Sequence, residues 1–136
     1  NCWVLGGVGG HAGVFATLDE VARWAASLAR AHDGLGSEWD PGVISEFWDG
    51  QNRASGSTWV LGWDTPSPQG SSAGTRVSPS AVGHLGFTGT SVWLDLEQGL
   101  SVVLLTNRVH LGEGSQDAIR RYRPRFHDGI RDLLGI

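Results

Sequence analysis

Apolar residues recur every three or four positions in the first third of the chain, a spacing that predicts an amphipathic helix. Thr17 and Glu20 match the capping box that opens a helix, and Asp33-Gly34 is a typical end. Asp40-Pro41 predicts a second, short helix, with aspartate as N-cap and proline in the first position. The apolar stripe of the first helix consists of Leu18, Val21, Ala22, Ala25, Leu28 and Ala29.

Beyond the second helix the pattern changes to short segments rich in β-branched and aromatic residues, which are typical of strands. The short links between the last three of these segments predict an antiparallel meander. The apolar run Val102–Leu105 predicts a central strand buried on both faces, so helices should cover both sides of the sheet. The Pro-, Gly- and Ser-rich segment 66–80 is predicted to be an exposed connection. The predicted strands are 59–63, 82–87, 90–95 and 100–106.

The last part of the chain returns to a helical spacing. Ser115 is the predicted N-cap of a final helix, which Pro124 should interrupt because proline lacks the amide that a helix needs. The arginine cluster at 120–125 is predicted to be a solvated helix face, with partner or phosphate binding as the alternative. Together these elements predict an α+β fold, in which helices flank an antiparallel sheet.

Composition narrows the class of protein further. The chain has 136 residues, of which 40% are hydrophobic and 18% charged, as expected of one globular domain. Its formal net charge of −4 gives no basic surplus for a phosphate backbone, so we expect no nucleic-acid partner. No apolar run approaches membrane-spanning length, so we expect no membrane span. The single cysteine, Cys2, excludes an internal disulfide.

Several short motifs have the spacing of functional signatures but lack the setting that their chemistry requires. Gly7-x-Gly9-x-x-Ala12 has the spacing of a dinucleotide-binding loop, yet the predicted helix begins too late to present its amides to a phosphate. Gly70-x-Ser72-x-Gly74 has the spacing of a nucleophile elbow, yet it lies in a loop rather than between a strand and a helix. The five histidines show no local metal-ligand pairing. We therefore expect no metal and no cofactor.

The segment Gly83–Thr90 differs because it places a titratable side chain, His84, inside a predicted strand and beside glycines. Glycines remove side-chain bulk, so a ligand can approach the strand backbone. An open strand edge there can pair with an extended substrate, and its amides can stabilise an oxyanion. The alternative is a core histidine beside a glycine-rich bend.

With these residues in view, three stretches together resemble the family of class C-type β-lactamases, DD-peptidases and related esterases. GHLGFTGTSVWLDLEQGLSVVLLTN resembles the region around the lysine-threonine-glycine motif of that family. GGHAGVFATLDEVARWAASL is similar to the loop and helix before that strand, and RYRPRFHDGIRDLL is similar to the closing helix. The resemblance implies the C-terminal portion of the β-lactamase/transpeptidase-like fold.

In that family a serine of a Ser-x-x-Lys motif attacks an acyl carbon, and the third motif lines the opposite wall of the cleft. By this resemblance His84 takes the lysine position, Leu85 the threonine position and Gly86 the glycine position. His84 would bind or polarise the substrate, and the backbone amide of Phe87 would be an oxyanion donor. The other residues implied to line the substrate are Thr88, His11 and Asn107.

Departures from the family pattern change the expected chemistry. His84 has a charge that changes near neutral pH, and Leu85 lacks the hydroxyl that would bind a substrate carboxylate. Both favour an esterase, a peptidase or an amidase over an efficient β-lactamase. The chain contains no lysine, and its single tyrosine, Tyr122, is followed by Arg123-Pro124. Ser-x-x-Lys and Tyr-x-Asn are therefore both missing.

We accordingly expect 1–136 to be a single partial domain whose nucleophile lies upstream, in a longer polypeptide or on a separate chain. The expected substrate is a small acyl ester, an amide or a peptide, and the chain alone should not turn it over. The alternative is a non-catalytic binding module that contacts the missing half, or another copy of itself, through exposed apolar surface. The resemblance suggests a location in the bacterial envelope.

Overall fold

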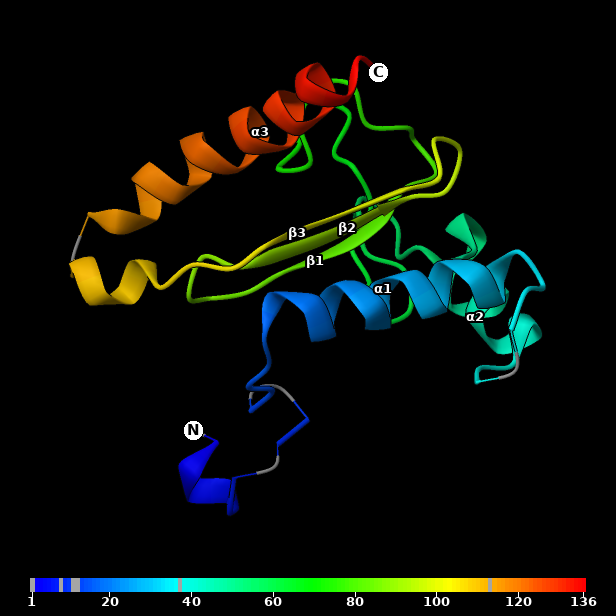
Figure 1. Ribbon diagram of the computed structural model, residues 1–136, viewed down its shortest axis with the longest axis horizontal. Coiled ribbons are helices and arrows are strands. Elements are labelled where there is room, and N and C mark those ends of the chain that lie inside the picture. The colour runs from blue at the N-terminus through cyan, green and yellow to red at the C-terminus, as the bar shows by residue number, and fades with distance from the viewer. Residues whose placement is uncertain (1, 8, 11–12, 37, 113) are drawn as a thin grey trace.

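The computed structural model describes residues 2–7, 9–10, 13–36, 38–112 and 114–136. A three-stranded sheet lies between helix α1, Leu18–His32, and helix α3, Ser115–Leu134 (Figure 1). A shorter helix, α2, Pro41–Trp48, lies beside the end of α1. The expected α+β class, with helices on both faces of an antiparallel sheet, is confirmed.

Local capping starts both N-terminal helices where the sequence predicts. Thr17 Oγ1 accepts a hydrogen bond from Glu20 N at 3.3 Å, and Glu20 Oε2 accepts one from Thr17 N at 2.7 Å. Asp40 Oδ1 accepts hydrogen bonds from the amides of Gly42 and Val43, at 2.8 and 3.1 Å. Each cap satisfies amides that the first helical turn leaves without intrahelical partners. The predictions for α1 and α2 are confirmed.

The sheet is the predicted meander. Strand β1 is Val82–Leu85, β2 is Ser91–Asp95 and β3 is Leu100–Leu104, in the order β1-β2-β3 with antiparallel pairing throughout. Within the described residues β3 pairs only with β2, so the predicted central strand is an edge strand. An apolar run indicates that helices cover both faces of a strand, as α1 and α3 do here. It does not indicate whether further strands pair with both of its edges.

The apolar core lies on the face of the sheet that α1 covers. Ala25 and Leu28 of α1 and Trp48 of α2 pack against Val82 of β1 and Leu94 of β2. Val82 and Leu94 are direct cross-strand partners, so their side chains share that face. Burying side chains of this size stabilises the fold by roughly 1.5–3 kcal/mol each.

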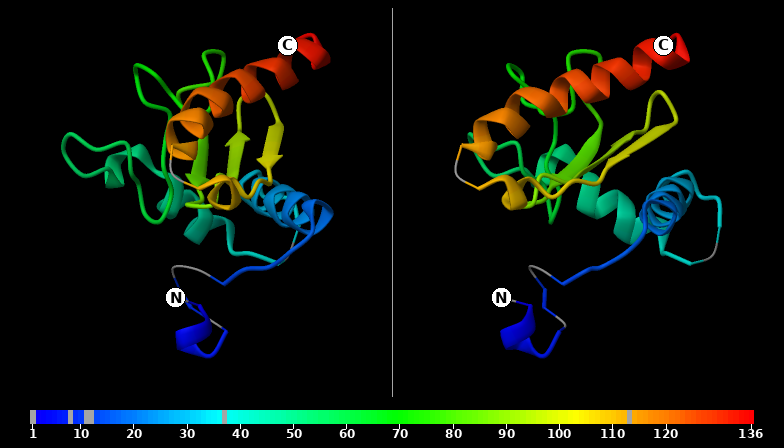
Figure 2. Two further views of the ribbon diagram at one scale, coloured as in Figure 1. Left: turned by 90° about the vertical axis from the view of Figure 1, so that its left-hand side faces the viewer. Right: turned by 60° about the vertical axis from the view of Figure 1, so that its left-hand side comes forward.

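Helix α3 covers the opposite face of the sheet (Figure 2). On that face the cross-strand partners Trp93 and Val102 are buried together with several polar groups. Arg131 Nη2 donates to Asp95 Oδ2 at 2.7 Å, and His127 Nε2 shares a hydrogen bond with Ser91 Oγ at 3.1 Å. Arg123 is also buried there. The arginine cluster is therefore not wholly a solvated face, because Arg123 is one helical turn from His127 and faces the sheet with it.

Two expectations for α3 are wrong. Ser115 is its first helical residue, and Gly114 occupies the N-cap position without a side-chain cap. The helix also continues through Pro124. An internal proline costs about 3 kcal/mol because it removes one hydrogen bond and crowds the preceding turn. The buried hydrogen bonds of α3 to the sheet on both sides of Pro124 offset that cost.

The segment before β1 also departs from the prediction. Residues 59–63 form a turn rather than a strand, since Gly62 has φ +74° and Val60 N donates to Trp63 O at 2.8 Å. The connection 66–80 contains no helix or strand, as expected, but it is not exposed throughout. Ala73 is fully buried, and Thr75 N donates to Asp128 of α3 at 2.7 Å. The connection therefore packs along α3.

Candidate functional site

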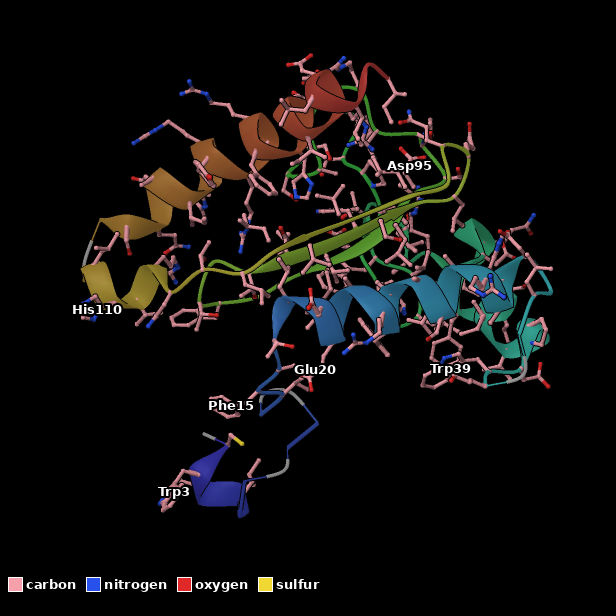
Figure 3. The ribbon with its side chains drawn as sticks, in the orientation of Figure 1. Trp3, Phe15, Glu20, Trp39, Asp95 and His110 are labelled. Carbon is pink, nitrogen blue, oxygen red and sulfur yellow. The ribbon has the colours of Figure 1, made fainter. Side chains whose placement is uncertain are left out.

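Strand β1 and the turn that follows it, residues 86–90, lie at one end of the sheet. Arg108 N donates to Thr88 O at 2.8 Å, which joins this turn to the short segment that contains His110. Asp95 lies at the opposite end of the sheet from His110 (Figure 3). The candidate site is thus far from the buried ion pair of Asp95.

His84 projects from the face of the sheet that carries Val82 and Val92, its cross-strand partner. Unlike Val82, His84 is exposed, because it lies nearer the open end of the sheet. The Trp59 ring lies edge-on to the imidazole with ring centroids 5.2 Å apart. This placement argues against a core histidine and leaves the imidazole available to a ligand, with Trp59 as one side of its surroundings.

The outer edge of β1 is partly occupied. Gly83 exchanges two backbone hydrogen bonds with Asp64, at 2.7 and 2.8 Å. Because backbone groups alternate in direction along a strand, Leu85 presents its own backbone groups to that same outer edge. The Leu85 side chain lies on the α3 face, opposite Ser91, and so points away from His84. Only the backbone of Leu85 is in position to contact a ligand bound beside His84.

Glycines let the 86–90 turn close tightly. Gly86 N donates to Thr90 O at 2.9 Å, and Gly89 N donates to Gly86 O at 3.0 Å. A Cβ on Gly86 would collide with Thr90 Oγ1, and one on Gly89 would collide with Thr106 Oγ1. Gly89 also has φ +98°, which L side chains rarely adopt. From the sequence, these glycines were expected to let a ligand approach the backbone. In the structure they also leave room for the side chains of Thr90 and Thr106.

Arg108 holds the tip of this turn. Its Nε donates to Phe87 O at 2.7 Å, and its guanidinium lies 4.5 Å from the centre of the Phe87 ring. Thr106 Oγ1 donates to Thr88 O at 3.0 Å. The Phe87 side chain is nevertheless 78% exposed, and within the described residues its amide donates no hydrogen bond. A free amide on an otherwise anchored turn is a suitable oxyanion donor.

Arg123 holds the base of the turn from α3, since its guanidinium donates to the carbonyls of Gly86, Gly89 and Thr90. The roles of Arg108, Arg123 and Trp59 at this site were not predicted from the sequence. A signal existed for Arg123, because it falls on one helical face with His127 and Arg131 at a spacing of four residues.

Of the remaining predicted site residues, the structure describes Thr88 and Asn107 but not His11. Thr88 is exposed at the tip of the turn beside Phe87, and exposed Asn107 directly precedes Arg108, whose side chain binds Phe87 O. His11 lies outside the described residues, and its predicted position at the rim stays a prediction. Among the residues that the structure describes, no three side chains form a metal-binding group. None of the helices described is long and apolar enough to cross a membrane.

Two titratable groups buried beneath α3 have displaced pKa values. Burial opposes ionisation of Asp95, but hydrogen bonds from Ser78 and Arg131 outweigh it and lower the pKa of the carboxyl below its ordinary value. Burial, followed by the positive charge of Arg131, lowers the pKa of His127 to about 4. Asp95 is therefore ionised and His127 neutral at pH 7, which suits an ion pair and a neutral hydrogen bond respectively.

Comparison with known proteins matches the sequence of this chain to one family. The beta-lactamase family model matches residues 3–124. A Salmonella gallinarum protein named "Putative D-alanyl-D-alanine carboxypeptidase" is 31% identical over 109 residues, which are 78% of this chain and 25% of that protein. A Salmonella agona protein of the same name is 29% identical over 110 residues, with the same coverage of each chain. The chain thus spans about a quarter of the length of these relatives. No solved structure matches it.

Proposed function

Because the chain belongs to the beta-lactamase family, we propose that it supplies one wall of a serine acyl-hydrolase site whose nucleophile lies outside these residues. The observation that carries this proposal is the geometry of the 86–90 turn. The turn is anchored by Arg108 and Arg123, while the Phe87 amide, just beyond the end of β1, donates no hydrogen bond to any described residue. An enzyme gains most from donors that are fixed before charge develops on the substrate.

The proposed reaction is acyl transfer to a serine. The serine oxygen bonds to the acyl carbon, and the electron pair of the carbonyl moves onto its oxygen. The Phe87 amide stabilises that oxyanion until the pair returns, the bond to the alcohol or amine breaks, and the leaving group departs with a proton. Water then releases the acid. His84 binds the end of the substrate beyond the scissile bond, with Trp59 packed against the imidazole.

The proposed substrate is an acyl ester, an amide or a short peptide that lies extended along β1. The backbone groups of Leu85 can pair with such a peptide, because Asp64 occupies the strand edge only as far as Gly83. The relatives carry the name of a carboxypeptidase acting on D-alanyl-D-alanine, so a peptide with that terminus is the first substrate to test. His84 and Leu85 in place of lysine and threonine favour esters and peptides over cephalosporins.

The test uses the complete polypeptide that contains these residues together with a Ser-x-x-Lys segment. We expect it to hydrolyse a D-alanyl-D-alanine peptide or a short aryl ester faster than a cephalosporin. The 136-residue chain alone should show no turnover and no covalent labelling by a fluorophosphonate. Labelling of a serine within the chain, or a preference for cephalosporins, would contradict the proposal.

A non-catalytic interaction module is the second candidate, favoured by the unpaired edge of β3 and by an apolar flank on α3. Tyr122 and Phe126 stack at 5.9 Å between centroids on this flank, beside a hollow of about 510 Å³ that Ile130 and Leu133 also line. Exposed apolar surface of this kind is typical of contact with another chain. A complete polypeptide that lacks Ser-x-x-Lys would favour this candidate.

A further inference from the structure

We propose that Arg123 is a positioning residue that aligns and polarises the Phe87 amide through the peptide bond that joins Gly86 to Phe87. This inference rests on the proposed function and assigns to α3, on the far side of the sheet from His84, a part in the same site. No residue of α3 touches the substrate in this scheme.

The geometry links the two groups directly. Arg123 Nη2 donates to Gly86 O at 2.8 Å, and this carbonyl belongs to the same planar peptide as the Phe87 N–H. The same Nη2 donates to Thr90 O at 2.8 Å, and Nε donates to Gly89 O at 3.2 Å. One guanidinium thus fixes both ends of the turn. The planar fork of arginine presents donors on separate nitrogens that reach carbonyls several ångströms apart, whereas the ammonium of lysine concentrates its three donors on one compact nitrogen.

The electrostatic consequence follows from the resonance of the peptide. A positive charge at the carbonyl oxygen draws electron density from the nitrogen, so the N–H at the other end of the peptide becomes a stronger donor. Arg123 is 7% exposed, so water screens this effect little. Burial, and then the nearby charge of Arg108, lower the pKa of Arg123 below its ordinary value. The guanidinium nevertheless remains protonated at neutral pH.

Arg108 completes the set of fixed carbonyls from the other side. Its side chain binds Phe87 O and its amide binds Thr88 O. Every carbonyl oxygen from Gly86 to Thr90 therefore accepts at least one hydrogen bond. The amides of Gly86 and Gly89 donate hydrogen bonds to carbonyls within the turn. The Phe87 amide is thereby held in place and directed outward.

The first experiment needs no enzymatic activity. The 136-residue chain is labelled with ¹⁵N-phenylalanine, and amide signals are compared for wild type, Arg123→Met, Arg123→Lys and the matched control Arg121→Met. Arg121 is exposed on the opposite face of α3. We expect the Phe87 proton signal to move upfield in Arg123→Met, further than those of Phe15 and Phe47, and to move less in Arg123→Lys. Arg121→Met should leave it in place.

The second experiment measures catalysis in the complete polypeptide with paired ester and thionoester substrates. Sulfur is a weak hydrogen-bond acceptor, so a well-aligned oxyanion donor favours the oxygen ester. Arg123→Met should lower kcat for the ester by about tenfold or more, less than the roughly 10²–10³ that loss of a direct donor costs. KM should change little, and the ratio of ester to thionoester rates should fall.

The outcomes separate the two proposals. An unmoved Phe87 signal in Arg123 variants that remain folded would overturn the inference, and so would equal losses for ester and thionoester. If Arg123→Met does not fold, Arg123→Gln, which removes the charge and keeps a polar side chain, provides the comparison. If the wild-type complete polypeptide hydrolyses no acyl substrate, the proposed function fails, while the labelled chain still shows whether Arg123 sets the Phe87 amide.

Discussion

At the scale of single residues, the candidate site depends on how closely backbone and side chains approach one another around the 86–90 turn. Gly86 and Gly89 each lie where a Cβ would overlap a threonine hydroxyl. His84 is exposed beside Trp59, and the Phe87 amide is free. Substitutions that add even a single methyl group in this region should therefore have a large effect on stability.

We predict that Gly86→Ala destabilises the protein by about 1–3 kcal/mol, because the new Cβ must displace Thr90 Oγ1. Thermal unfolding measures the change. The double variant Gly86→Ala with Thr90→Ala should recover much of the loss, since it removes the atom that collides. Gly129→Ala is the matched control: its Cβ meets nothing within 4 Å in α3, so stability should stay equal or rise. Equal losses for both alanine variants would contradict a local clash.

His127 should make stability depend on pH. Its pKa is about 4 in the folded chain against an ordinary 6.5, so the folded state favours the neutral imidazole. Protonation would also place a second N–H at Nδ1, which has no partner within the described residues. The contribution is complete above pH 6.5 and is lost as the pH falls toward 4. The full loss is about 3 kcal/mol.

Urea unfolding at pH 7 and pH 4 tests this for wild type and His127→Gln, which cannot titrate. The wild-type free energy of unfolding should fall more steeply than that of the variant. Asp95 should lose its contribution to stability at a lower pH than His127 does. Hydrogen bonds keep the pKa of its carboxyl below 3.8 despite burial, so the carboxylate is protonated only on further acidification. Parallel decline of both proteins between pH 7 and pH 4 would argue against His127 as the source.

At the scale of elements, α3 packs on the sheet through buried polar side chains in addition to apolar ones such as Ile119. Arg123, His127 and Arg131 lie on its sheet-facing side, while Tyr122 and Leu133 are exposed. Hydrogen bonds are directional, so this stripe fixes the rotation and the axial position of α3 against β2. A continuous helix through Pro124 keeps the three side chains in register.

We predict that Arg131→Met destabilises the protein by about 3–5 kcal/mol, because it leaves the Asp95 carboxylate buried without its charged partner. The two side chains are 2% and 1% exposed. Arg120→Met is the matched control on the same helix: Arg120 and Asp117 are 69% and 73% exposed and 3.9 Å apart. That change should cost about 0.5 kcal/mol or less. Denaturant unfolding compares the two variants, and similar losses would show that α3 does not depend on the buried pair.

At the scale of the whole molecule, one side of the sheet is closed and the other is open. Asp64 covers part of the edge of β1, whereas β3 has no further partner in the described chain. The apolar flank of α3 is exposed as well, with Leu133 84% accessible. These surfaces would suit contact with another polypeptide segment, and the relatives, of which the matched residues make up 25%, contain further chain of that kind.

We predict that the isolated chain self-associates through the flank of α3 and that Leu133→Glu weakens this association, because a charge on that flank would lose hydration in the contact. Leu111→Glu is the control, since Leu111 is also exposed but lies outside α3. Analytical ultracentrifugation across a concentration series measures the effect. A wild-type monomer at all concentrations would count against an exposed docking surface, and an equal effect of both variants would count against this flank.

The sequence by itself determined the features that depend on neighbours within a few residues. The caps at Thr17 and Asp40, the meander of three strands and the position of His84 in β1 follow from local hydrogen bonding and from residue periodicity. The family resemblance likewise came from short stretches of the sequence. Turn 59–63 and the uninterrupted α3 escaped prediction, because a single glycine dihedral and distant packing outweighed local propensity.

Only the tertiary structure decided how the 86–90 turn is held. Arg123 reaches Gly86 across 37 residues and Arg108 reaches Phe87 across 21, and no local pattern specifies which carbonyls an arginine will find. The same holds for Asp95 with Arg131, which lie 36 residues apart. Burial determines the effect of each of these charges, since a guanidinium on a solvated helix would polarise nothing. Arg123, which the sequence placed in a solvated cluster, thus holds the backbone of the candidate site together with Arg108.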